Sequence, residues 1–145
     1  MLKFQQGFTM VEILIVITIV SMLAGLGYFM DLNILKSNIF SSDLNGIVDS
    51  IRRSRSEALN NIDNSAHGIK ILPDSYVLFE GQNYDSRIVS KDQIIPVNSE
   101  LTFSGLNEAV FTQLSGESTA SGSIMVTEGL KTSAITINYD GGVNW

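Results

Sequence analysis

Hydrophobic residues form an unbroken block near the start of the chain. From Ile13 to Met30 there is no charged residue, and Thr18 and Ser21 stand alone among hydrophobic residues and glycines. A helix needs about 20 mostly apolar residues to cross the hydrocarbon core of a bilayer, where it satisfies its own backbone hydrogen bonds. The pattern therefore predicts a membrane-spanning helix over residues 8–30.

The hydrophobic pattern changes its period after this block. Apolar residues then recur at spacings of three and four, which indicates an amphipathic helix with one apolar stripe. The polar face includes Asp49 and Arg53, whose i,i+4 spacing predicts an ion pair. We expect one long helix from about Thr9 to about Asn61, with residues 31–62 as its amphipathic continuation. The apolar stripe consists of Leu32, Leu35, Ile39, Leu44, Ile47, Val48, Ile51, Ala58, Leu59 and Ile62.

Short strand-like segments follow from Gly68 to the end of the chain. They alternate with turn signals such as Pro73-Asp74-Ser75 and Asp140-Gly141-Gly142, the second of which suits a hairpin with positive φ. We therefore expect an α+β fold, in which a β-rich extracytoplasmic domain over residues 63–145 packs on the apolar stripe. The expected strands are 68–72, 76–79, 87–89, 93–95, 101–103, 109–112, 123–127 and 132–139, with a loop over 115–122.

A carboxylate lies at the edge of the apolar block. Glu12 runs directly into Ile13, and an unpaired carboxylate in hydrocarbon costs on the order of a few kcal/mol, less near the interface. Glu12 therefore lies in the headgroup layer or has a partner. Lys3 precedes the block and Asp31 follows it, so the positive-inside rule places the N-terminus in the cytoplasm and most of the chain outside.

The residues around Glu12 resemble the signal of type IV prepilins and type II secretion pseudopilins. A short leader, residues 1–7, ends in Gly7, Phe8 follows, and Glu12 is the fifth residue after the leader. The resemblance implies that prepilin peptidase cleaves after Gly7 and that Phe8 becomes the N-methylated first residue. Glycine suits the cleavage position because it lets the backbone extend without a side chain that would crowd the peptidase.

The resemblance also implies a partner for Glu12. After cleavage Phe8 has a cationic amine, and a carboxylate in a low-dielectric layer favours such a partner. In a filament of parallel helices, Glu12 of one subunit would meet the Phe8 amine of its neighbour and set the axial register. The implied partners are prepilin peptidase, other pilins or pseudopilins in a filament or tip complex, and the bacterial inner membrane. The alternative is that Glu12 pairs only with lipid headgroups.

The second half of the chain is similar to the GspH/FimT-type minor pseudopilins and minor pilins. The Tyr-Pro element of major pilins is absent, and Arg55-Ser56-Glu57-Ala58 is followed by Gly68-Ile69-Lys70-Ile71 and many short strands. This similarity implies a low-copy structural subunit of a type II secretion pseudopilus or type IV pilus. Members often have Gly-Arg-Val near the end, whereas here Gly142 runs directly into Val143, without the basic residue associated with DNA binding in some members.

Two plainer interpretations of the N-terminus stay open. A conventional secretory signal would be cleaved near Gly25-Leu26-Gly27, and an unprocessed membrane anchor would keep its first residues. Neither explains the spacing between Gly7, Phe8 and Glu12.

A binding module at a pilus tip, for DNA or another ligand, is a different kind of function. Its candidate surface is the basic cluster of Arg52, Arg53 and Arg55, which equally suits a solvated helix face paired with Asp49 and Glu57. The formal net charge of −6 disfavours nonspecific nucleic-acid binding, because that binding needs basic residues to release counterions from phosphate.

The composition favours a structural protein over an enzyme. The chain has no cysteine and one histidine, His67, which we expect in a loop, so a zinc site is not predicted. It also lacks a nucleophile elbow, a phosphate loop and a histidine with an evident partner. We therefore expect no catalytic residues, no metal and no cofactor.

Overall fold

The computed structural model describes residues 7–145, without the side chains of residues 26–38. Most of the expected leader, residues 1–6, lies outside the described residues, as do the side chains of Asp31, Leu32 and Leu35. The chain divides into two compact units, the first ending at Ile39 and the second being Phe40–Trp145.

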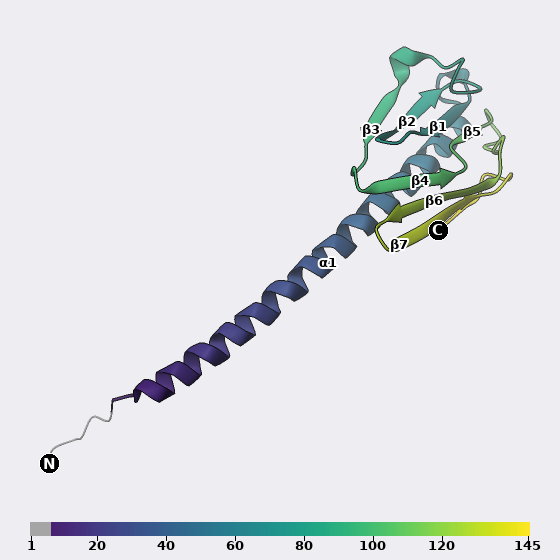
Figure 1. Cartoon of the computed structure of the whole chain (residues 1–145). Coiled ribbons are helices and arrows are strands. Elements are labelled where there is room, and N and C mark those ends of the chain that lie inside the picture. The colour runs from purple at the N-terminus through teal and green to yellow at the C-terminus, as the bar shows by residue number, and fades with distance from the viewer. Residues whose placement is uncertain (1–6) are drawn as a thin grey trace. The chain divides into compact units, whose positions relative to one another are not determined.

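One helix, α1 (Met10–Leu59), contains 50 residues and is continuous (Figure 1). It confirms the predicted long helix to within two residues at each end. The helix ends just before Asn61, which has the left-handed conformation with φ of 54°. The Asn61 N–H donates to the carbonyl of Ala58 at 3.1 Å. Asparagine tolerates this conformation better than most residues, which explains why the Asn-rich segment terminates the helix.

Across the described part of the chain, no helix is both long and apolar enough to cross a membrane. The expected span over residues 8–30 runs into the stretch whose side chains are not described.

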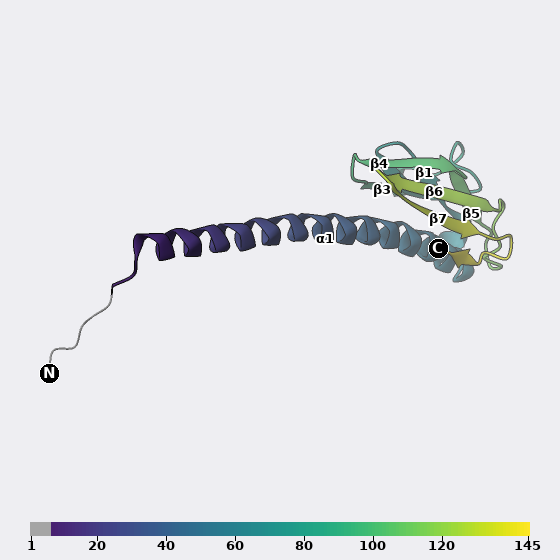
Figure 2. The same cartoon turned by 60° about the horizontal axis from the view of Figure 1, so that its bottom comes forward.

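The second unit contains two four-stranded antiparallel sheets, with orders β3-β2-β1-β5 and β4-β6-β7-β8. Figure 2 shows β4, β6 and β7 side by side. The strands alternate with two short 3-10 helices, and together with α1 they confirm the α+β fold. Their bounds are η1 Ile62–Asn64, β1 His67–Ile71, β2 Ser75–Glu80, η2 Val89–Lys91, β3 Gln93–Pro96, β4 Leu101–Gly105, β5 Glu108–Phe111, β6 Gly122–Glu128, β7 Lys131–Ile137 and β8 Val143–Asn144.

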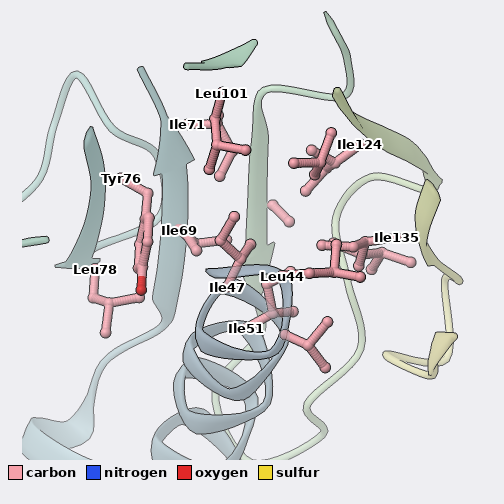
Figure 3. Packing of buried hydrophobic residues seen from close by; sticks show 14 of the residues in the cluster. Leu44, Ile47, Ile51, Ile69, Ile71, Tyr76, Leu78, Leu101, Ile124 and Ile135 are labelled. Carbon is pink, nitrogen blue, oxygen red and sulfur yellow. The ribbon is translucent and has the colours of Figure 1, made fainter. Parts of the chain in front are cut away.

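Within the second unit, the last five turns of α1 and both sheets share one hydrophobic core. Figure 3 shows Leu44, Ile47 and Ile51 of α1 between residues of the two sheets. Ile47, Ile51 and Ala58 are fully buried, which confirms that the predicted stripe packs on the β-rich domain. The sheets supply Ile69, Ile71, Tyr76 and Leu78 on one side and Leu101, Ile124, Val126, Ile135 and Ile137 on the other.

The stripe is narrower than the sequence predicted. Ile39, Leu59 and Ile62 are 42%, 41% and 46% exposed. Residues at spacings of three and four drift around a helix, so a stripe drawn over thirty residues includes positions that turn away from the domain.

The predicted hairpin at Asp140-Gly141-Gly142 is confirmed. Ile137 of β7 pairs with Val143 of β8, and Gly141 has φ of 77°. An added Cβ at Gly141 would lie 2.1 Å from the carbonyl oxygen of Gly116, so both the turn and the close approach require glycine.

The connection between β2 and β3, residues 81–92, was predicted wrongly. The expected strand over 87–89 is absent, and residues 89–91 form η2 instead. Arg87 donates to Asp92 at 2.8 Å and to the carbonyl of Tyr84 at 2.7 Å, which closes the segment into a loop. The ring of Tyr84 meets Phe79 edge-on, with centroids 5.6 Å apart, so the connection packs on a buried side chain of β2.

Candidate functional site

The expected processing site lies in non-helical chain directly before α1. Gly7, Phe8 and Thr9 precede the first helical residue, Met10. An added Cβ at Gly7 would meet nothing within 4 Å, and the Phe8 side chain is 79% exposed. The peptide bond between Gly7 and Phe8 is therefore open to a peptidase, and cleavage at this bond stays a prediction.

Thr9 and Glu12 form a reciprocal cap on the first turn of α1. The Glu12 N–H donates to the Thr9 hydroxyl at 3.3 Å, and the Thr9 N–H donates to the Glu12 carboxylate at 3.4 Å. This is a capping box, which satisfies two backbone N–H groups that have no partner inside the helix. Reading the sequence for charge alone misses this role, although Thr-x-x-Glu before an apolar run is its signature.

The cap also places the Glu12 carboxylate next to the expected new N-terminus. Its Oε2 atom lies 3.4 Å from the backbone nitrogen of Thr9, one residue from Phe8. If the chain is cleaved after Gly7, the nitrogen of Phe8, the residue before Thr9, becomes a free amine. The positive end of the helix dipole favours an anion at the same place.

The segment that follows Glu12 is apolar on every side. Ile13, Leu14, Ile15, Val16 and Ile17 are all at least half exposed, although their side chains point in different directions around the helix. Thr18, one of its few polar residues, keeps its hydroxyl bonded to the carbonyl of Leu14 at 2.8 Å. A helix that is hydrophobic all round needs a cover of lipid or of other protein.

The three arginines of the basic cluster all bind groups of the same chain. The Arg52 guanidinium lies 4.1 Å from the centroid of the Trp145 ring, and Arg53 pairs with Glu57 at 2.8 Å rather than with Asp49. Arg55 donates to the carbonyls of Gly116 at 3.2 Å and Asp140 at 2.9 Å.

The contacts of Arg52 and Arg55 have a structural role, because they hold the C-terminal residues Trp145 and Asp140 on α1, while Arg53 is paired within the helix. A nucleic-acid site needs arginines that are free to contact phosphates or bases. The cluster therefore favours the interpretation of a helix face with local partners over that of a DNA-binding patch.

His67 does not lie in a loop, as the sequence predicted, but begins β1 and is 6% exposed. Its Nε2 lies 3.0 Å from the carbonyl of Ile62, and its Nδ1 lies 3.5 Å from Glu57 Oε2. Pairing of β1 with both β2 and β5 draws this residue into the sheet. A single histidine among polar residues gives no pattern from which this could be predicted.

An ion network that the sequence did not reveal lies beside His67. Lys91 Nζ contacts Asp63 Oδ2 and Glu80 Oε2, each at 2.7 Å. The Lys91 hydrogen bond lowers the pKa of Asp63, while the bonds to Asp63 and Glu80 raise the pKa of Lys91. The hydrogen bond with Asp92 likewise raises the pKa of Arg87. The two Lys91 pairs fasten the connection 81–92 to η1 and β2, and no local sequence pattern predicts that Lys91 meets Asp63.

Among the described residues, no group of three His, Cys, Asp or Glu side chains is arranged to hold a metal ion. Asp63 and Glu80 are instead paired with Lys91, and Glu57 is paired with Arg53.

Comparison with known protein families gives one match. Residues 2–28 match the family described as the prokaryotic N-terminal methylation motif. The matched stretch contains Gly7, Phe8 and Glu12, and it supports a precursor of the type IV pilin kind. Comparison with curated proteins and with solved structures found no match.

Proposed function

We propose that this chain is a minor pilin or pseudopilin of the GspH/FimT type, a structural subunit of a type II secretion pseudopilus or type IV pilus. The observation that carries the proposal is the methylation motif over residues 2–28, combined with the position of Glu12 in the first turn of α1. The subtype rests on the similarity of the second half of the chain to these minor subunits.

The proposed function has three steps, which the open bond after Gly7 and the exposed apolar segment support. Prepilin peptidase cleaves the open bond after Gly7, and Phe8 is N-methylated. The apolar segment holds the subunit in the inner membrane, with its N-terminus in the cytoplasm and the β-rich domain outside. On assembly the same segment exchanges lipid for the helices of neighbouring subunits, because both surroundings cover a helix that is apolar all round.

Glu12 sets the register of this assembly in the proposed mechanism. A carboxylate among apolar helices is stabilised by a cation, and the Phe8 amine of an adjacent subunit is the cation that processing creates. Pairing neutralises both charges and fixes one axial offset between subunits. Lipid headgroups alone would neutralise Glu12 without selecting an offset.

The proposal is tested by shearing filaments from cells that carry the complete secretion or pilus system and probing for this chain. We expect the mature chain in the filament fraction, at much lower copy number than the major subunit. Its confinement to the membrane fraction while the major subunit is sheared off would contradict the proposal. A deletion strain that carries a plasmid copy provides the matched control.

A further inference from the structure

A cleft of about 690 Å³ lies in the β-rich unit. Its walls come from the α1–β1 connection, the β2–β3 connection, the end of β5 and the β5–β6 connection. This volume falls within the range of roughly 300–1,000 Å³ that small-molecule sites occupy. Neither processing nor helix packing in a filament uses these residues.

The chemistry of the walls is polar without charge. No lining residue is Asp, Glu, Lys, Arg or His, although charged residues make up 17% of the chain. Hydroxyl and amide groups dominate, including Ser65, Gln82, Ser86, Gln113 and Thr119, while Ile88 and Val110 supply an apolar surface. A phosphate, nucleotide or acidic ligand would find no cation here, so the lining selects neutral ligands.

Two of the amides are oriented before any ligand arrives. Gln113 Nε2 donates to Asn61 Oδ1, and Asn61 Nδ2 donates to Asn64 Oδ1 at 3.0 Å. This chain of amides uses the donor side of Gln113 and the acceptor side of Asn64. It leaves an acceptor on Gln113 and a donor on Asn64, and a sugar hydroxyl can bond to both kinds of group.

The backbone beside the cleft is held in a costly conformation. Asn61, Asp63 and Asn64 have φ between 53° and 56°, and Leu114 has φ of 66°. A left-handed non-glycine residue costs on the order of 1 kcal/mol or more, and such residues gather at binding sites. Leu114 is the most informative, because its side chain is 66% exposed and so gains little from packing in return.

An extended peptide is a poorer fit than a sugar. β5 is the edge strand of its sheet beside the cleft, but its carbonyl at Val110 already accepts from the Thr119 N–H at 2.9 Å, and Phe111 forms a bridge with Ser118. Strand addition needs a free edge, so recognition here depends on side-chain hydroxyls and amides. We propose that this cleft binds a neutral carbohydrate, with Gln82, Gln113 and Thr119 as hydrogen-bonding residues.

The test is a glycan array probed with the full chain in detergent. It carries neutral oligosaccharides of hexoses and N-acetylhexosamines, their sialylated and sulfated counterparts, and unmodified peptides. We expect retention on neutral glycans. Gln82→Leu and Thr119→Val should each weaken binding roughly tenfold, since each removes a hydrogen bond to the ligand. Neither side chain has a hydrogen-bond partner among the described residues, so both variants should fold.

The matched control is Gln93→Leu, which changes another exposed glutamine, in β3 and outside the cleft. It should bind as the unchanged chain does. Retention only on charged glycans or only on peptides, no retention at all, or equal binding by all three variants would each overturn the carbohydrate site. None of these results would bear on processing or assembly.

Discussion

The hydroxyl of Thr9 accepts the Glu12 N–H at 3.3 Å while the Glu12 carboxylate accepts the Thr9 N–H at 3.4 Å. Glu12 therefore has a local role in the isolated chain, which is to cap α1, as well as its proposed role between subunits. The two roles are compatible because a carboxylate offers about four lone-pair positions. The cap holds the carboxylate against Thr9, one residue from Phe8, which is the expected N-terminus of a processed chain.

Substitution of Glu12 should separate processing from assembly. Glu12→Leu removes the carboxylate from an apolar segment, so insertion and cleavage should persist while the amount in sheared filaments falls at least about tenfold. Immunoblots of membrane and filament fractions give both quantities. Thr18→Val is the matched control, because the Thr18 hydroxyl bonds only within its own helix at 2.8 Å and should be dispensable. A normal amount of Glu12→Leu in the filament fraction would contradict the role of Glu12 in setting the register.

Lys91 should shape the pH dependence of stability. The hydrogen bond from Lys91 lowers the pKa of Asp63 below 3.8. The stability that this bond contributes is therefore present above pH 3.8 and is lost as the pH falls through the folded-state pKa of Asp63. Asp63 and Glu80 raise the pKa of Lys91 above 10.5. The stability that charged Lys91 contributes is therefore present below pH 10.5 and is lost as the pH rises through the folded-state pKa of Lys91.

Lys91→Met should therefore lower the midpoint of thermal unfolding at neutral pH. The midpoint should also fall less steeply toward acidic and toward alkaline pH than it does in the unchanged chain. Circular dichroism of the full chain in detergent, from about pH 3 to pH 11, measures this. Lys131→Met is the control, because Lys131 lies 5.8 Å from the Phe40 ring centroid and its curve should keep the original shape. If the midpoint of Lys91→Met declined at acidic pH as steeply as that of the unchanged chain, the bond between Lys91 and Asp63 would contribute nothing to folding.

Arg55 should stabilise the C-terminal hairpin and should not bind DNA. Arg55→Met removes two charge-assisted hydrogen bonds to carbonyls, which should cost about 1.5–3 kcal/mol of unfolding free energy. Urea unfolding checks the loss, and Arg53→Met is the control because its exposed pair with Glu57 is worth less than about 1 kcal/mol. Salt-sensitive DNA retention by the unchanged chain that Arg55→Met abolishes would contradict the structural role.

Gly68 should not tolerate a side chain. A Cβ there would lie 2.5 Å from Phe79 Cζ and 2.9 Å from the carbonyl oxygen of Ala109. Gly68→Ala should lower the unfolding free energy by about 1–3 kcal/mol, because β1 is fixed between two strands and cannot move aside. Gly122→Ala is the comparison, since its Cβ would meet Leu106 at an ordinary 3.6 Å and should cost far less. Equal losses of unfolding free energy in the two variants would show that β1 shifts to make room for the added methyl group.

The sequence predicts best where a periodic pattern is long. The length of α1, the burial of Ile47 and Ile51, and the hairpin at Gly141 follow from periodicity and from the conformational freedom of glycine. The processing residues are predicted from a short motif that needs no tertiary structure. Each of these signals is a repeat along the chain or a short motif, so none depends on contacts between segments that are distant in the sequence.

The errors concern residues whose contacts follow no periodic pattern in the sequence. Arg87 reads as part of a strand until its bond to Asp92 is known, and His67 reads as a loop residue until β1 is seen to pair on both sides. Lys91 and Asp63 meet only because the β2–β3 connection folds back toward η1. The uncharged cleft is assembled from four separate segments and has no motif.

Mass spectrometry of the mature N-terminus, in a host with and without prepilin peptidase, tests the central claim most directly. We expect a chain that begins at Phe8, is methylated there, and is found only when the peptidase is present. The membrane fraction of the peptidase-deficient host should contain the uncleaved precursor. An intact Met1 in the presence of the peptidase, or cleavage near Gly27, would contradict the pilin pathway and leave Glu12 with its helix cap as its sole role.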